Sequence, residues 1–209
     1  MKKIFMYSML VFAVLFGSVA SVSAQSKQLE KNTKKRAKEL KKEGWTMQAS
    51  TTTLDYALLK YNTYLEEDED NRIPLTGIAT GKNPKIGREN AIQNAITSYA
   101  SRAKAQVVGK VKSIMSSDAS VTTEEIDKFG AAYESGVNTK ISGLVKQHFV
   151  LVREGSDGNK EFNVFMSIDE AKAKQAREEA ATEARKQASL GNLSQQVEEF
   201  IGEPVEGEE

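Results

Sequence analysis

The sequence predicts an α+β fold, in which a small antiparallel sheet packs on a pair of long amphipathic helices. Apolar residues recur at helical spacing over residues 85–115 and again over residues 123–144. The period then changes to alternation in two runs, 145–153 and 160–168, which a Gly-rich segment separates. Consecutive helices joined by a short polar turn pack antiparallel, and two alternating runs around such a turn form a β-hairpin.

The chain begins with a predicted secretory signal peptide, residues 1–24. Two lysines precede the apolar run Ile4–Phe16, which is too short to span a bilayer and leads to a cluster of small residues. Cleavage between Ala24 and Gln25 would leave a mature chain of 209 − 24 = 185 residues. The chain has no cysteine, so it has neither a disulfide framework nor a lipid-attachment cysteine. We therefore expect a periplasmic or secreted protein without a transmembrane anchor in the mature chain.

A basic helix is expected first in the mature chain, within residues 25–45. The segment from Ser26 to Lys42 carries eight Lys or Arg against two Glu, and Gly44 is placed to end the helix. A thin apolar stripe argues against a helix that binds a membrane surface through an apolar face, since the stripe comprises only Leu29, Ala37 and Leu40. We expect the basic residues to lie near the chain's own acidic loop or tail. The only tryptophan, Trp45, is expected to fold back on the helix end and pack there.

Residues 46–169 are expected to form the α+β domain. The segment Thr52–Asp55 is typical of a capping box, which would open a second helix, and the acidic run 66–70 ends that helix as a solvated loop. Residues 73–80 are strand-like. Pro74 near the start of this strand predicts a place at the edge of the sheet, because proline cannot donate to a neighbouring strand.

The longest helix is predicted to begin at Asn83, with Asn83 as N-cap and Pro84 in the first helical position. After the second helix of the pair, the hairpin strands carry alternating apolar residues. These are Phe149 and Leu151 on the first strand, and Phe162, Val164, Met166 and Ile168 on the second. We expect them to place one face of the sheet on the helices and to leave the other face to water.

Asp169 is expected to cap a helix of a different kind over residues 170–190. Its only periodic stripe is alanine, at Ala173, Ala176, Ala180, Ala184 and Ala188. The buried area that alanines offer is small, so we expect this helix to be exposed. It is also the predicted contact with a protein partner or with a second copy, as in a coiled coil. Residues 191–209 form an acidic tail that is expected to be disordered.

The residues that carry chemistry are few, and no catalytic, cofactor or metal site is predicted. One histidine, His148, and no cysteine exclude the usual zinc and Ser-His-Asp arrangements, so His148 is expected at the surface of a strand. The segment Gly77–Lys82 differs from a phosphate-binding loop in its spacing and lacks the Ser or Thr that follows the lysine. Loss of two lysines with the signal peptide leaves 29 − 2 = 27 basic residues against 29 acidic ones, which argues against nucleic-acid binding.

The segment Ala37–Trp45, followed by a helix centred on Leu54, resembles a group of uncharacterised envelope proteins of Gram-negative bacteria that carry signal peptides. In that group a basic helix ending in Gly-Trp precedes a Gly-containing strand, a long Ala-rich helix and a closing hairpin. The matching segments here are Gly77–Gly81, Ala91–Ala105 and Val145–Ile168. More remotely, this order is similar to that of the small lipoprotein-20 family and the flagellar T-protein N-domain. The resemblance covers about residues 35–170 and implies a fold but no site.

The function expected from these observations is that of an exported, non-enzymatic module, which binds a protein or a component of the cell envelope. The alternative is a ligand-binding or hydrolytic domain with a cleft of carboxylate and tyrosine side chains. Tyr99, Tyr133 and Arg102 are the first candidates for such a cleft. Both tyrosines lie on predicted apolar faces, however, and are expected in the core.

Overall fold

The computed structural model describes residues 26–115, 122–155, 158–187, 197 and 200–205. The predicted signal peptide and its cleavage site lie outside these residues. The chain forms an α+β fold, as predicted. Its elements are an N-terminal helix (residues 26–42), β1 (Thr46–Met47), α2 (Leu54–Glu66), β2 (Arg72–Gly81), α3 (Pro84–Met115), α4 (Thr123–Ile141), β3 (Lys146–Glu154), β4 (Lys160–Asp169) and α5 (Glu170–Gln187). No helix in the described ranges is both long enough and apolar enough to cross a membrane.

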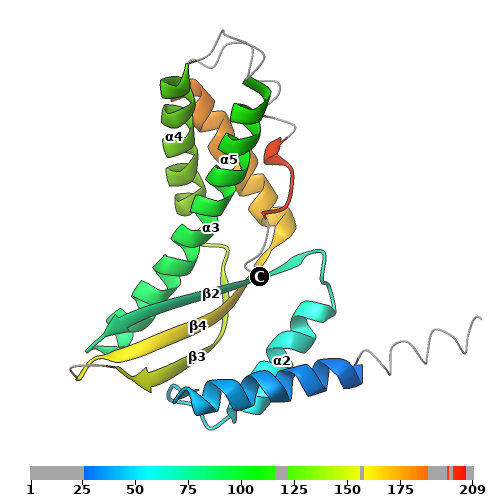
Figure 1. Ribbon diagram of the computed structural model, residues 1–209, viewed down its shortest axis with the longest axis vertical. Coiled ribbons are helices and arrows are strands. Elements are labelled where there is room, and N and C mark those ends of the chain that lie inside the picture. Colours follow the sequence, from blue (N-terminus) through cyan, green and yellow to red (C-terminus); the bar gives the residue numbers. More distant parts are fainter. Residues whose placement is uncertain (1–25, 116–121, 156–157, 188–196, 198–199, 206–209) are drawn as a thin grey trace, which may run out of the picture.

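Helix α3 connects the two parts of the molecule (Figure 1). Its 32 residues span about 48 Å at 1.5 Å per residue. One end lies on the sheet, against β2 and β4, and the other end packs with α4. α5 completes a three-helix bundle, while α2 and the N-terminal helix lie at the opposite side of the sheet. The predicted antiparallel pairing of α3 and α4 is confirmed, because Lys112 pairs with Asp127 near one end and Asn138 donates to Thr97 nearer the other.

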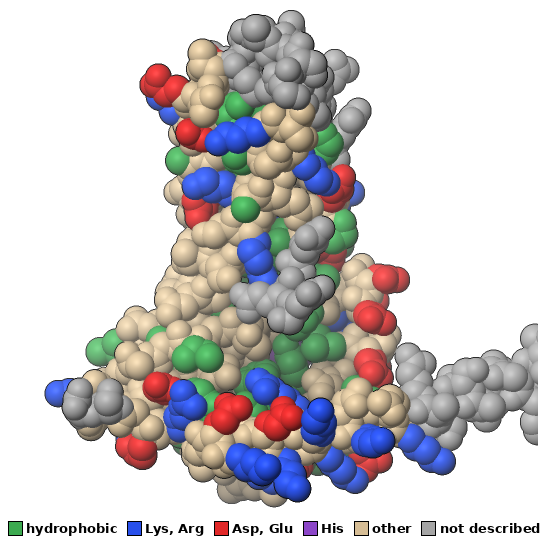
Figure 2. Space-filling model, viewed as in Figure 1, with side chains coloured by type: hydrophobic (Ala, Val, Ile, Leu, Met, Phe, Trp, Pro, Cys, Tyr) green, Lys and Arg blue, Asp and Glu red, His purple; other side chains and the backbone are tan. Residues whose placement is uncertain are grey.

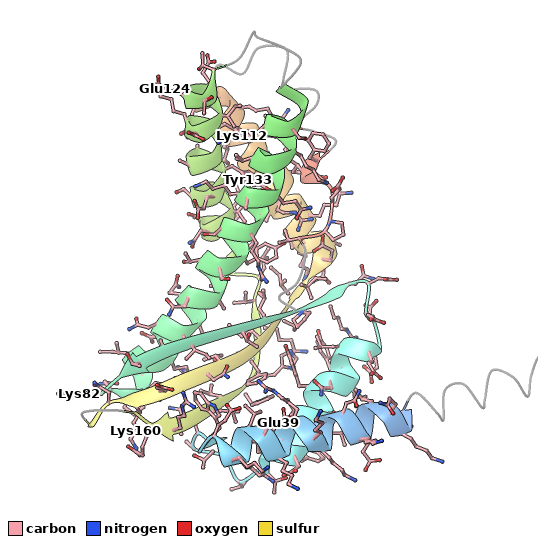
Figure 3. The ribbon with its side chains drawn as sticks, in the orientation of Figure 1. Glu39, Lys82, Lys112, Glu124, Tyr133 and Lys160 are labelled. Atoms are coloured by element: carbon pink, nitrogen blue, oxygen red, sulfur yellow. The ribbon has the colours of Figure 1, made fainter. Side chains whose placement is uncertain are left out.

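The sheet has four strands in the order β1-β3-β4-β2, and all neighbours are antiparallel. The predicted hairpin is β3 and β4, and β2 lies at an edge, as Pro74 indicates. Lys82, which follows β2, and Lys160, which begins β4, lie at the same end of the sheet (Figure 3). The strand β1 was not predicted, because two residues are too few to show a period.

Both faces of the sheet are covered, so the expectation that one face lies in water is wrong. On one face, Phe162 and the alternate residues that follow it pack against α3 in the main core. On the other face, Phe149 and Leu151 pack with α2 and the N-terminal helix in a second cluster, which also contains Phe165. The two apolar sets predicted to share a face thus lie on opposite faces. Trp45 belongs to the second cluster, which confirms that it packs after the N-terminal helix.

Local capping agrees closely with the sequence. The side chain of Asn83 accepts hydrogen bonds from the first backbone N–H groups of α3. At the start of α5, the carboxylate of Asp169 accepts a hydrogen bond of 3.0 Å from the backbone N–H of Lys172. The N-cap of α2 is Thr53, one residue later than expected. The carboxylate of Asp55, which a capping box would use, pairs with Lys41 of the N-terminal helix instead.

The segment Gly77–Lys82 has a packing explanation. A Cβ atom on Gly77 would lie 1.9 Å from the carbonyl oxygen of Ala91, so only glycine allows β2 to lie this close to α3. The resemblance to a phosphate-binding loop therefore reflects the contact between a strand and a helix.

Helix α5 is not an exposed helix, and this prediction is wrong. Its alanine face is buried against the rest of the bundle, where Ala173, Ala176, Ala180 and Ala184 are at most 5% exposed. Gly136 on α4 allows this approach, since a Cβ atom there would lie 2.9 Å from the Cβ of Ala180. The face that was predicted to meet a partner is thus covered by the same chain. Ala188 lies outside the described residues.

Part of the acidic tail also differs from the prediction. Val197, Ile201 and Val205 are buried in the main core rather than disordered. The guanidinium of Arg177 on α5 donates to the carbonyl oxygens of Ile201 and Glu203, at 3.4 and 3.0 Å. Residues 191–196, 198–199 and 206–209 of the predicted tail lie outside the described ranges.

Candidate ligand-binding groove

A groove of about 650 Å³ lies between the start of β3, one side of α2 and the loop that follows β1. Arg88 of α3 also contributes to its lining. The side chains that give it chemical character are one histidine, three tyrosines and three cations, namely His148, Tyr56, Tyr61, Tyr64, Lys60, Arg88 and Lys146. We call this feature the His148 groove.

A β-bulge in β3 determines the position of His148. Gln147 is opposite Met166 and Phe149 is opposite Phe165, so His148 is the extra residue between them. A bulge changes the direction of side chains locally and is common beside functional sites. The opposite edge of β3 is open here, since pairing with the β1 segment ends where Gln48 N donates to Val150 O at 2.9 Å. The groove therefore begins where β1 leaves β3 unpaired.

Two tyrosines of α2 pack against the histidine ring. The ring centroids of Tyr61 and Tyr64 lie 5.0 and 4.8 Å from that of His148. Tyr61 is fixed because its hydroxyl donates to Met166 O at 2.8 Å, and burial raises its pKa above the usual value. Tyr56, by contrast, is 61% exposed. The helical spacing that places these tyrosines on one side of α2 thus provides an aromatic wall with one accessible ring.

All the charged side chains that line the groove are cationic. Its lining contains Lys60, Arg88 and Lys146 but no Asp or Glu. Lys146 Nζ lies 4.1 Å from the centroid of the Tyr64 ring, and the guanidinium carbon of Arg72 lies 4.0 Å from the same ring. Arg88 Nε is buried and has no hydrogen-bond partner among the described residues. A buried donor without a partner is costly, and this nitrogen is itself closed to solvent.

His148 is uncharged at neutral pH in this environment. Burial, and then the charges of Lys146 and Lys60, lower its pKa from 6.5 to about 4. Its Nε2 atom lies 2.8 Å from Ser167 Oγ, and the tautomer decides which of the two atoms donates. His148 lies in a strand, as expected, and its ring is half-buried against the tyrosines rather than fully exposed. Alternation alone gave no sign of the bulge.

The Ser167–His148 pair has the separation of a nucleophile and its base, but its surroundings do not suit hydrolysis. Ser167 is 2% exposed and does not line the groove. The charged groups that act on His148 are lysines, whereas a catalytic histidine is oriented by a carboxylate. The pair is better explained as a contact that fixes the imidazole ring. The groove carries tyrosines and cations, and its lining contains no carboxylate of the kind that the alternative cleft requires.

The residues that the sequence singled out for a cleft lie elsewhere. Tyr99 and Tyr133 are fully buried in the main core, as expected, and Tyr133 lies among the bundle helices in Figure 3. Arg102 is half-buried on α3 and does not line the groove. The acidic run 66–70 instead forms ion pairs through Glu67 and Asp68, both with Arg72. Within the described residues, no cluster of His, Asp and Glu has the arrangement of a metal site.

Removal of one groove cation should be visible at the only histidine. We expect Lys146→Gln to raise the pKa of His148, because the charge of Lys146 opposes protonation of the ring. An NMR titration of the single imidazole would measure the change. Lys172→Gln, which removes an exposed charge on α5, is the matched control and should leave the pKa unchanged. Equal titration curves for wild type and Lys146→Gln would contradict the electrostatic description of the groove.

Comparison with known proteins gives no family assignment: no protein-family model matches the chain, and a search of curated proteins returns no match. The groove geometry is therefore the basis for the function proposed below.

Proposed function

We propose that this protein is an exported, non-enzymatic binding module and that the His148 groove takes an anionic component of the cell envelope. The observation that carries the proposal is the lining itself, which combines three cations with three tyrosines and contains no carboxylate. The predicted signal peptide supports the location, and the resemblance to envelope proteins supports the setting.

The groove offers separate contacts for the charged and the uncharged parts of such a ligand. A carboxylate or phosphate would accept hydrogen bonds from Lys60, Lys146 and the guanidinium of Arg88, which all line the groove. A sugar ring or apolar group would pack on the exposed ring of Tyr56. A neutral His148 adds no charge to the groove. Its imidazole ring instead provides a fixed aromatic surface against which a ligand can pack. The volume of about 650 Å³ is within the range of small-ligand sites.

Titration with small anions tests this proposal, with the His148 ring signals and Trp45 fluorescence as readouts. The probes are glucuronate and glucose 1-phosphate, with glucose as their neutral counterpart. We expect both anions to shift the His148 signals in a dose-dependent way and glucose to have no effect. Lys60→Gln/Lys146→Gln should weaken anion binding at least about tenfold, because two charge-assisted contacts are lost.

The matched control is the double variant Lys128→Gln/Lys172→Gln, which loses two positive charges outside the groove. Both residues are exposed, on α4 and α5. This control should bind the anions as wild type does. The proposal fails if glucose shifts the signals as much as the anions do, or if the groove variant and the control bind equally well.

A further inference from the structure

The N-terminal helix presents nearly all of its positive charge on one face. Successive residues turn by about 100°, so the seven lysines between Ser26 and Lys42 fall in an arc of about 120°. They extend over about 22 Å of helix at 1.5 Å per residue. Every one of them is exposed. We call this surface the lysine face, and it consists of Lys27, Lys31, Lys34, Lys35, Lys38, Lys41 and Lys42.

The buried side of the same helix does not overlap the lysine face. Thr33, Ala37 and Leu40 are at most 2% exposed, and Thr33 accepts a hydrogen bond from Asn62 of α2 at 2.8 Å. By the same helical geometry, the centre of this buried side is rotated by about 130° from the centre of the lysine face. The lysine face therefore points away from the side of the helix that packs on the domain. Figure 2 shows Lys and Arg side chains gathered along the edge of the molecule that this helix forms.

Among the described residues, the acidic loop and the described part of the tail form no ion pair with this face, in contrast to the expectation from the sequence. Asp68 and Glu67 pair with Arg72, and Glu203 of the described tail pairs with Lys110 on α3. Glu66 and Glu67 lie near the start of the helix, where they line a hollow together with Ser26, Leu29 and Glu30. Only Lys34 and Lys41 of the lysine face form ion pairs with described residues, with Glu30 and Asp55. Five exposed lysines thus remain unpaired within the described part of the chain.

We propose that the lysine face docks the mature protein on an anionic phospholipid surface. A stiff, outward row of ammonium groups matches a flat array of headgroup phosphates better than it matches a compact ligand. The apolar residues of the helix are used against α2, so the contact is electrostatic and does not insert the helix. The helix has no aromatic side chain on which bases could stack, which makes single-stranded nucleic acid a poorer match. This inference does not depend on the His148 groove.

Co-sedimentation with vesicles tests this docking, using the mature chain from Gln25. The vesicles contain phosphatidylcholine with phosphatidylglycerol, or phosphatidylcholine alone. We expect binding to the anionic vesicles at low salt, weaker binding at about 0.15 M salt because of screening, and none to the neutral vesicles. Changing the five unpaired lysines to glutamine should lower the partition coefficient at least about a hundredfold. These are Lys27, Lys31, Lys35, Lys38 and Lys42.

A control variant has the same number of Lys→Gln changes at exposed positions outside the helix, namely Lys82, Lys85, Lys128, Lys172 and Lys186. It should bind anionic vesicles far more strongly than the lysine-face variant does. The proposal is overturned if the wild type stays in the supernatant with anionic vesicles at low salt, or if both variants lose binding equally. It is also overturned if the wild type binds soluble dextran sulfate but not the anionic vesicles, since the partner is then a soluble polyanion.

Discussion

Replacement of Arg177 by methionine is expected to lower the free energy of unfolding by about 3–5 kcal/mol. Arg177 is 1% exposed, and its Nη2 atom lies 2.6 Å from Glu170 Oε1. Its Nη1 atom also donates to the Tyr99 hydroxyl at 2.5 Å. The variant leaves the Glu170 carboxylate buried without its cation. It also removes the donor from two carbonyl oxygens of the C-terminal segment. Urea unfolding followed by circular dichroism would measure the loss.

The double variant Glu170→Leu/Arg177→Met separates the cost of a lone charge from the cost of lost packing. Removal of both partners leaves no uncompensated charge, so the double variant should be more stable than Arg177→Met alone. It should still be less stable than wild type, because Ile201 and Glu203 lose their hydrogen bonds in both variants. Lys174→Met, an exposed change on the same helix, is the control and should have little effect. Equal stability of the single and double variants would contradict a buried ion pair.

The network around Arg177 also illustrates what the sequence could not show. Arg177 lies in a helix most of whose other charged residues are exposed, and nothing in its sequence neighbours distinguishes it. Its burial follows from the C-terminal segment, which covers this side of the bundle and supplies two carbonyl acceptors. The alanine stripe of α5 was visible in the sequence, but the element that packs against this stripe was not. Stripes of small residues allow close approach of another helix, and only the fold shows that α4 is that helix.

Elements with strong local signals were predictable. Asn83 and Asp169 cap the helices that follow them, as predicted, and long apolar periods located α3 and α4. The alternating runs located the hairpin as well. These signals depend on a residue and its near neighbours in the chain, which is why a single sequence is sufficient for them.

The candidate groove depends on contacts between distant segments, and so the sequence did not reveal it. The bulge at His148 is defined by the register between β3 and β4, and the tyrosines come from a helix some 90 residues earlier in the chain. The second cluster beneath the groove combines Phe149 with residues as early as Ala37. One signal was available: Tyr56 and Tyr64 lie eight residues apart, with Lys60 midway between them, on one side of a predicted helix. Such a row of aromatic and cationic residues is typical of a binding surface rather than of a core.

Phe162→Ala is expected to destabilise the protein by about 3–5 kcal/mol, because a fully buried ring is replaced by a cavity. Phe162 belongs to the main core on the α3 side of the sheet. Thermal unfolding followed by circular dichroism would measure the change. Ile78→Ala on the edge strand is a suitable control, since Ile78 is 53% exposed and should contribute little. A melting temperature for Phe162→Ala near that of wild type would show that this face of the sheet is not the core.

The contact between Phe162 and Gly87 allows a sharper test, because the effect of a second substitution should change sign. A Cβ atom on Gly87 would lie 2.3 Å from the Phe162 ring, so Gly87→Ala alone should cost about 1–3 kcal/mol through overpacking. In the Phe162→Ala background the ring is absent. The added methyl group then fills part of the cavity, and alanine favours the helix over glycine by about 1 kcal/mol. Gly87→Ala should therefore stabilise the Phe162→Ala protein. Independent, additive effects of the two substitutions would contradict the close packing of α3 on β4, on which the arrangement of the bundle and the sheet depends.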